Sequence, residues 1–167
     1  VAIKLLHVRH TGRELEVKRF QREAALVTRL DHPNIVKTLD YGHDQDGVPF
    51  IVFELLEGDA LKSKLQADGA LSASRAGTIT LQVLSALEHA HAFGIVHRDI
   101  KPANVFLCAG RDSDFARVLD FGIAKALTPD NTNQHTKLTA TGQIIGTPHY
   151  MAPEQIKGLA IGPNSDL

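Results

Sequence analysis

The sequence predicts an α+β protein in which a small sheet-rich part precedes a mostly helical part. Before Gly58 the chain holds short runs rich in β-branched and aromatic residues, at positions 1–6, 35–41 and 49–55, which are typical of strands. After Gly58 apolar residues recur at helical spacing, most clearly in residues 72–92. A length of 167 residues with 43% hydrophobic residues is enough for one core. We therefore expect two lobes within a single domain.

A helix is predicted between the first two strands, over residues 15–30. Its apolar side chains are spaced by three and four positions, as one buried helix face requires: Val17, Phe20, Ala24, Val27 and Leu30. Pro33 follows closely, and the residue before a proline avoids the helical region, so the helix ends there. A polar turn, residues 43–47, is expected to join the second and third strands.

Two helices are predicted after Gly58. Residues 59–66 form a short one, and residues 72–92 form a long one. Ser72 is suited to cap the long helix at its start, and Gly94 is suited to stop it.

Two short strands and a loop complete the expected elements. Residues 105–108 and 116–119 are predicted as two short strands. Residues 125–145 are polar and rich in threonine, which indicates a mobile surface loop.

Composition and charge limit the partners and the cellular location that we expect for this chain. The net charge of −1 indicates neither a nucleic-acid partner nor an anionic membrane partner. The longest apolar-rich stretch without charge, residues 76–87, is too short to span a bilayer. A single cysteine excludes an internal disulfide and suits a cytoplasmic setting. The chain begins with Val1 and not Met, so we expect the native N-terminus, and any membrane anchor it carries, to lie elsewhere.

The most informative segment is His-Arg-Asp-Ile-Lys-Pro-Ala-Asn at residues 97–104, followed by Asp-Phe-Gly at residues 120–122. It combines a carboxylate base, a basic group and side chains that suit a metal ion. These are the groups needed to hold a nucleoside triphosphate against a hydroxyl. In order and spacing the two motifs resemble the catalytic loop and the magnesium loop of eukaryotic-type (Hanks-type) protein kinases.

The resemblance implies catalytic and metal-binding roles. Asp99 would be the catalytic base, which orients the substrate hydroxyl, and Lys101 would offset charge on the transferred phosphate. Asn104 and Asp120 would offer the hard oxygen ligands that Mg²⁺ takes.

It also implies an ATP site, with ATP and Mg²⁺ as cofactors. Lys4, in Val-Ala-Ile-Lys, would bind the α- and β-phosphates and pair with Glu23 on the first helix. The adenine pocket would be formed by Ala2 as roof, Phe106 as floor, Phe53 at the back, and the backbone of Glu54 and Leu56.

The substrate class follows from the same resemblance. Lys101 in the catalytic loop, and Thr147 within Gly-Thr-Pro-His-Tyr-Met-Ala-Pro-Glu at residues 146–154, resemble serine/threonine kinases, in which Thr147 would contact the catalytic aspartate and lysine. Residues 122–125 and 152–155 further resemble bacterial members. We therefore expect proteins with serine or threonine as substrates.

A regulatory switch is also implied. Arg98 precedes the catalytic aspartate, and family members with this arginine are often controlled by phosphorylation of a nearby loop. Thr139 and Thr141 stand where related bacterial kinases autophosphorylate, a reaction for which a dimer is possible. A phosphate there would pair with Arg98.

The resemblance covers residues 1–167 and predicts a partial kinase domain, truncated at both ends. Residues 1–56 match part of the N-lobe with the hinge, and residues 57–167 match part of the C-lobe. The glycine-rich phosphate loop of the family would lie before Val1, and Asp166 resembles the buried aspartate that braces the catalytic loop. Two alternatives stay open: a pseudokinase acting as a binding module, and a small-molecule phosphotransferase.

Overall fold

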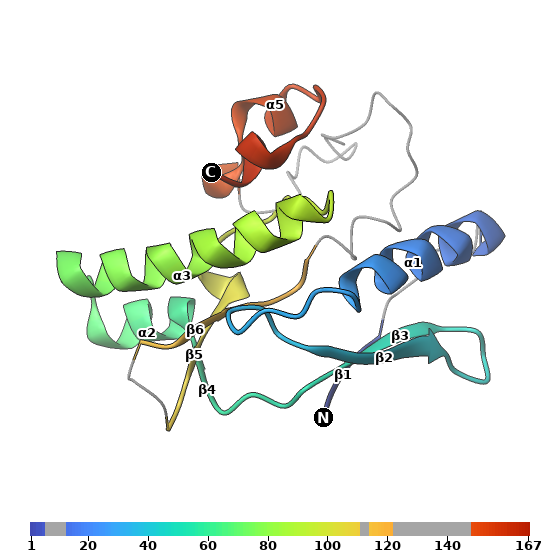
Figure 1. The fold of residues 1–167 in the computed structure, drawn as a ribbon, viewed down its shortest axis with the longest axis horizontal. Coiled ribbons are helices and arrows are strands. Elements are labelled where there is room, and N and C mark those ends of the chain that lie inside the picture. The colour runs from blue at the N-terminus through green and yellow to red at the C-terminus, as the bar shows by residue number, and fades with distance from the viewer. Residues whose placement is uncertain (6–12, 111–113, 122–147) are drawn as a thin grey trace, which may run out of the picture.

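The computed structural model describes residues 1–5, 13–110, 114–121 and 148–167. The strands are β1 (Ala2–Leu5), β2 (Thr38–His43), β3 (Pro49–Phe53), β4 (Gly58–Ala60), β5 (Val105–Cys108) and β6 (Ala116–Val118). The helices are α1 (Arg13–Val27), α2 (Leu61–Asp68), α3 (Ala73–Ala92), α5 (Pro153–Ile156) and the short 3-10 turns η1 (Pro102–Asn104), η2 (Pro148–Tyr150) and η3 (Pro163–Asp166). Figure 1 shows α1 with β1–β3 in one half and α2, α3 and β4–β6 in the other, which agrees with the predicted α+β, two-lobed architecture.

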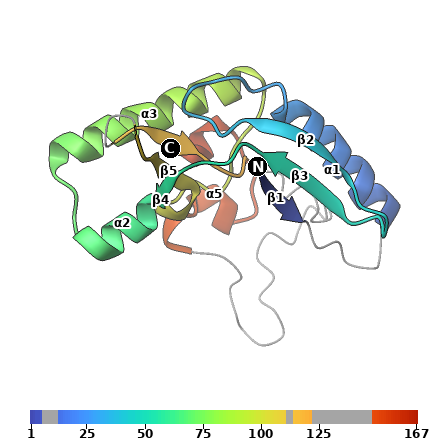
Figure 2. The ribbon, with the colours of Figure 1, turned by 90° about the horizontal axis from the view of Figure 1, so that it is seen from below.

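The first half is an antiparallel sheet in the order β1-β3-β2, with α1 along it (Figures 1 and 2). Side chains of the central strand alternate, and Ile51 and Phe53 point into the core. On α1, Phe20 and Ala24 are fully buried, and the Phe20 ring lies edge-on to Tyr41 of β2 at 6.4 Å. Of the apolar positions predicted for this helix, Phe20, Ala24 and Val27 are buried, whereas the side chain of Val17 lies outside the described residues.

The second half is built on α3, whose bounds match the prediction closely. The Ser72 hydroxyl accepts a hydrogen bond from the Arg75 amide at 3.3 Å, so Ser72 is the N-cap. The buried face of α3 consists of Ile79, Val83, Ala86, Leu87 and Ala90. A small antiparallel sheet, β4-β5-β6, lies on the other side of this half from α5 (Figure 1).

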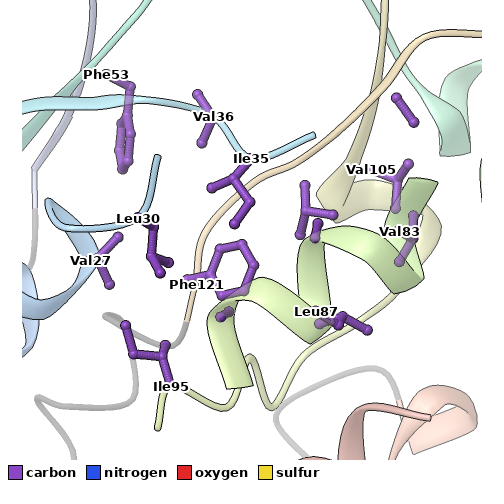
Figure 3. Packing of buried hydrophobic residues seen from close by; sticks show 14 of the residues in the cluster. Val27, Leu30, Ile35, Val36, Phe53, Val83, Leu87, Ile95, Val105 and Phe121 are labelled. Carbon is purple, nitrogen blue, oxygen red and sulfur yellow. The ribbon is translucent and has the colours of Figure 1, made fainter. Parts of the chain in front are cut away.

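One continuous core joins the two halves. Ile35 forms a parallel bridge with Val118, and the Val36 amide donates to the Val118 carbonyl at 3.0 Å. Phe121 is 2% exposed and lies in the middle of a cluster whose members come from both halves (Figure 3). The two lobes therefore share buried apolar surface.

Several predicted boundaries were wrong, and two of them were wrong for identifiable reasons. The second strand begins at Thr38 instead of residue 35, because residues 34–36 hydrogen-bond with Val118 across the lobe boundary. Helix α1 ends at Val27 instead of residue 30. The Leu30 amide donates to the Val27 carbonyl, three positions back, so the chain tightens into a turn there.

Strand β4 was not predicted at all. Residues 58–60 were assigned partly to a helix, whereas they pair with β5 and the helix α2 begins only at Leu61. Three residues show no alternation, and long-range pairing alone creates this strand.

The loop predicted at residues 125–145 lies outside the described residues. Within the described ranges, each helix is too short or too polar to cross a membrane.

Candidate active site

A pocket of about 270 Å³ opens where β1, the linker after β3 and the second sheet meet. Its lining includes every residue that the resemblance assigns to the adenine pocket, together with Lys4: Ala2, Lys4, Phe53, Glu54, Leu56 and Phe106. Val36 and Leu119, which the sequence did not indicate, also line it. The walls are apolar except at Lys4, Glu54 and Asp120, so the pocket suits a flat apolar ring attached to a charged group.

The linker after β3 forms one edge of the pocket. The Glu54 amide donates to the Lys37 carbonyl at 3.0 Å, and the Glu54 carboxylate accepts from the Lys37 amide at 2.7 Å. The same carboxylate forms an ion pair with Arg117. Since the Glu54 N–H is already used, its carbonyl is the backbone group it retains for a ligand.

Lys4 and Asp120 lie together at the charged end of the pocket. The Lys4 ammonium is 2.7 Å from the Asp120 carboxylate, and both side chains are 37% exposed. The sequence predicted Glu23 as the partner of Lys4; Glu23 is half-buried on α1, and that pairing stays a prediction. Asp120 has a φ of 59°, a left-handed backbone that is uncommon outside glycine and occurs often at functional sites.

The loop at residues 97–104 brings two polar side chains, those of Lys101 and Asn104, to the carboxylate of Asp99. The Lys101 ammonium is 2.7 Å from Asp99 Oδ2. Asn104 donates from Nδ2 to the Asp99 carbonyl at 2.8 Å and to Oδ2 at 3.1 Å. These contacts fix the direction of the Asp99 carboxylate, which is the requirement for a positioned base.

The donor set suits a magnesium ion. Because Asn104 uses its Nδ2 toward Asp99, its Oδ1 is the end of the amide suited to a cation. Asp120 offers a carboxylate that lines the pocket. The Leu119 amide, next to Asp120, donates to the Asn104 carbonyl at 2.9 Å, so the two segments are adjacent. Oxygen donors of this kind are what Mg²⁺ takes.

His97 connects the loop to the Asp120 segment. Its side chain is fully buried, its Nε2 lies 2.8 Å from the Leu119 carbonyl, and its Nδ1 accepts from the Asp99 amide at 3.2 Å. A neutral ring with the proton on Nε2 satisfies both contacts. Burial lowers the pKa of His97 below its usual 6.5, although the hydrogen bond to Leu119 acts in the opposite direction.

Asp166 braces the backbone of the same loop, as the resemblance implied. Its buried carboxylate accepts from the His97 amide at 2.8 Å and from the Arg98 amide at 2.7 Å. His91 Nε2 lies 2.8 Å from the same carboxylate. Arg98 has a φ of 67°, so the brace holds an unfavourable backbone conformation beside Asp99.

Arg98 is also held from α5. The Gln155 side chain donates to the Arg98 carbonyl at 2.8 Å and accepts from the Ala152 amide at 2.9 Å. Nearby, the Ser165 hydroxyl donates to Glu154, and this hydrogen bond lowers the pKa of Glu154. Neither the Gln155 contact nor the Glu54–Arg117 ion pair was predicted, because partners so far apart in sequence leave no local pattern.

The predicted site residues Thr139, Thr141 and Thr147 lie outside the described residues.

Comparison with known proteins identifies the family. The sequence model described as "Protein kinase domain" matches residues 1–167. The chain is 45% identical over 170 residues to serine/threonine-protein kinase pkn3 of Myxococcus xanthus. This alignment covers all of this chain and 30% of that protein. It is 40% identical over 167 residues to PrkC of Bacillus subtilis, again over its whole length, which corresponds to 24% of PrkC.

Solved structures agree with these sequence relatives. The PknI kinase domain of Mycobacterium tuberculosis superposes with a TM-score of 0.71 at 30% identity, over 98% of this chain and 56% of that one. Rad53 superposes with a TM-score of 0.66 at 28% identity, over 84% of this chain and 32% of that one. The chain belongs to the protein kinase family, and the predicted likeness to bacterial serine/threonine kinases is confirmed.

Proposed function

We propose that the protein transfers the γ-phosphoryl group of ATP to serine and threonine hydroxyls of other proteins. The observation that carries this proposal is the Asp99 carboxylate, held by Lys101 and Asn104 beside a segment that places Asp120 against Lys4. The names of the relatives support the serine/threonine class. The Rad53 structure is a complex with AMP-PNP, which supports a nucleotide in the pocket of this chain.

Each residue has a definable task in this reaction. The apolar pocket around Phe53 and Phe106 takes the adenine, and Lys4 binds the α- and β-phosphates. Asp99 orients the substrate hydroxyl, whose oxygen attacks the γ-phosphorus while the bond to the leaving ADP oxygen breaks, and the hydroxyl proton passes to Asp99. Lys101 offsets the charge on the transferred group. A magnesium ion held by Asn104 and Asp120 would shield the phosphate charges.

Phosphate transfer in the unaltered protein and in two variants tests this assignment. We expect Asp99→Asn to lower the rate of radiolabelled phosphate transfer to a generic protein substrate about 10²- to 10⁴-fold. Lys4→Ala should cost about 10²- to 10³-fold, because it removes a cation from the phosphates.

Matched controls separate these effects from general damage. Asp68→Asn and Lys62→Ala make the same changes on the exposed surface of α2 and should leave the rate unchanged. Wild-type-like activity in Asp99→Asn would contradict the role of Asp99. An unaltered protein that binds ATP but transfers no phosphate would favour the pseudokinase alternative.

Autophosphorylation at Thr139 and Thr141 is a further part of the proposal, with transfer between two copies of the protein. Phosphate there carries roughly −1.5 to −2 charges and suits a cation such as Arg98. Mass spectrometry of the active protein should find these sites occupied, and the Thr139→Ala/Thr141→Ala variant should lose activity. Full activity in that double variant would reject the switch.

A further inference from the structure

The ion pair between Glu54 and Arg117 joins two walls of the pocket. Glu54 is the first residue after β3 and lines the pocket edge, whereas Arg117 belongs to β6 in the other half. The Arg117 side chain is 17% exposed and the Glu54 side chain is 28% exposed, so solvent screens this pair only in part.

Glu54 is fixed at several points. Its amide and its carboxylate both bond to the backbone of Lys37, at 3.0 and 2.7 Å, and its carboxylate also receives the guanidinium of Arg117. The two Lys37 contacts tie Glu54 to its own half of the molecule. Arg117 supplies a tie to the opposite half.

Arg117 also lies next to the pocket floor. In the antiparallel pairing of β5 with β6 it stands opposite Phe106, which lines the pocket. Its guanidinium carbon is 5.8 Å from the centre of the Phe115 ring, a cation–π contact that restricts the side chain. One residue therefore reaches the floor through its backbone and the edge through its side chain.

We propose that Arg117 is a positioning residue for the adenine ring. By holding the Glu54 carboxylate it fixes the direction of the Glu54 carbonyl relative to the floor at Phe106. A hydrogen bond to a ligand weakens steeply when its acceptor turns away. This inference rests on the proposed function, because it assumes that the pocket takes ATP.

The experiment compares ATP affinity among variants that break or keep this ion pair. Isothermal titration calorimetry with ATP gives Kd, and steady-state assays give KM for ATP and kcat. Arg117→Met should weaken ATP binding about three- to tenfold and raise KM by the same factor, with kcat nearly unchanged. Arg117→Lys keeps the charge and should recover much of the affinity. Glu54→Gln should match Arg117→Met, and the double variant should cost no more than either single one.

Arg75→Met is the matched control. Arg75 forms an ion pair with Asp114 at 2.8 Å, on α3 and outside the pocket lining. Its loss should lower the melting temperature without changing Kd for ATP. If Arg117→Met fails to fold, the Arg117→Lys and Glu54→Gln variants carry the comparison.

The outcomes separate this inference from the proposed function. If the unaltered protein binds ATP and Arg117→Met and Glu54→Gln leave Kd unchanged, Arg117 has no positioning role, and the proposed function stands. The same conclusion follows if Arg117→Met changes kcat and not KM. If the unaltered protein does not bind ATP, both the proposed function and this inference are wrong.

Discussion

His97 is the residue on which the catalytic loop and the Asp120 segment both depend. It is fully buried and neutral, with its two ring nitrogens committed to the Asp99 amide and the Leu119 carbonyl. Protonation would place a charge in a position where Nδ1 has to accept a hydrogen bond. The stability of the site is therefore linked to pH.

We expect the free energy of unfolding to decrease as the pH falls below 6.5. Burial lowers the pKa of His97 in the folded state, so below 6.5 the unfolded chain takes up a proton that the folded chain refuses. The contribution is fully present above 6.5 and is lost as the pH falls toward the lowered pKa, with a slope of at most about 1.4 kcal/mol per pH unit.

Denaturant titrations between pH 5 and 8 measure this slope. His97→Gln should flatten the pH dependence even though it destabilises the protein at neutral pH. His32 also has a lowered pKa, caused mainly by burial, so His32→Gln is the necessary comparison. A slope that His97→Gln leaves unchanged would exclude His97 as its source.

The residues of the site were predictable where the chain itself keeps them together. Asp99, Lys101 and Asn104 lie within one short motif, and their mutual contacts follow from that spacing. The contact of Lys4 with Asp120 was not predicted, because only the fold brings these two charges to 2.7 Å, and the predicted pairing of Lys4 with Glu23 stays a prediction. No sequence pattern indicated a role for Arg117 at the pocket, because its partner Glu54 is 63 residues away in the sequence.

At the scale of the elements, prediction succeeded where local signals were complete. Helix α3 has both a capping serine and a regular apolar face, and its bounds were nearly correct. Strand β4 has neither alternation nor length, and it exists because Gly58 allows a close approach to β5. Gly58 has a φ of 136°, and a Cβ at this position would lie 2.1 Å from the Leu107 carbonyl oxygen.

Gly58→Ala should therefore destabilise the protein, by about 1–3 kcal/mol or more, since the backbone conformation and the contact are both unfavourable. Gly77→Ala makes the same chemical change on the exposed side of α3, where nothing lies within 4 Å of the new Cβ. That variant should stabilise the protein by about 0.5–1 kcal/mol. Thermal unfolding followed by circular dichroism compares them, and equal effects would show that the contact with β5 is unimportant.

At the scale of the whole molecule, the shared core makes the two lobes one unit. Phe121 contacts the His97 ring at 4.9 Å and lies within the cluster drawn in Figure 3, next to the catalytic loop and between the halves. Loss of packing at Phe121 therefore destabilises both halves of the molecule.

Phe121→Ala should lower the free energy of unfolding by about 3–5 kcal/mol, because it removes a large buried side chain. The loss should appear as one cooperative transition at a lower denaturant concentration. Phe93→Ala is the control: Phe93 is 42% exposed, and its loss should cost about 1 kcal/mol or less. Two separate transitions in the unaltered protein would contradict a shared core.

The brace at Asp166 has a consequence for the order in which the molecule matures. The amides of His97 and Arg98 donate to the carboxylate of Asp166, which lies 69 and 68 residues further along the chain. A growing polypeptide is synthesised from its N-terminus, so the His-Arg-Asp segment emerges long before its acceptor exists. Closing a loop of that length also carries an entropy cost. The nascent chain can thus form the walls of the pocket first, and the backbone of His97 and Arg98 is braced only later.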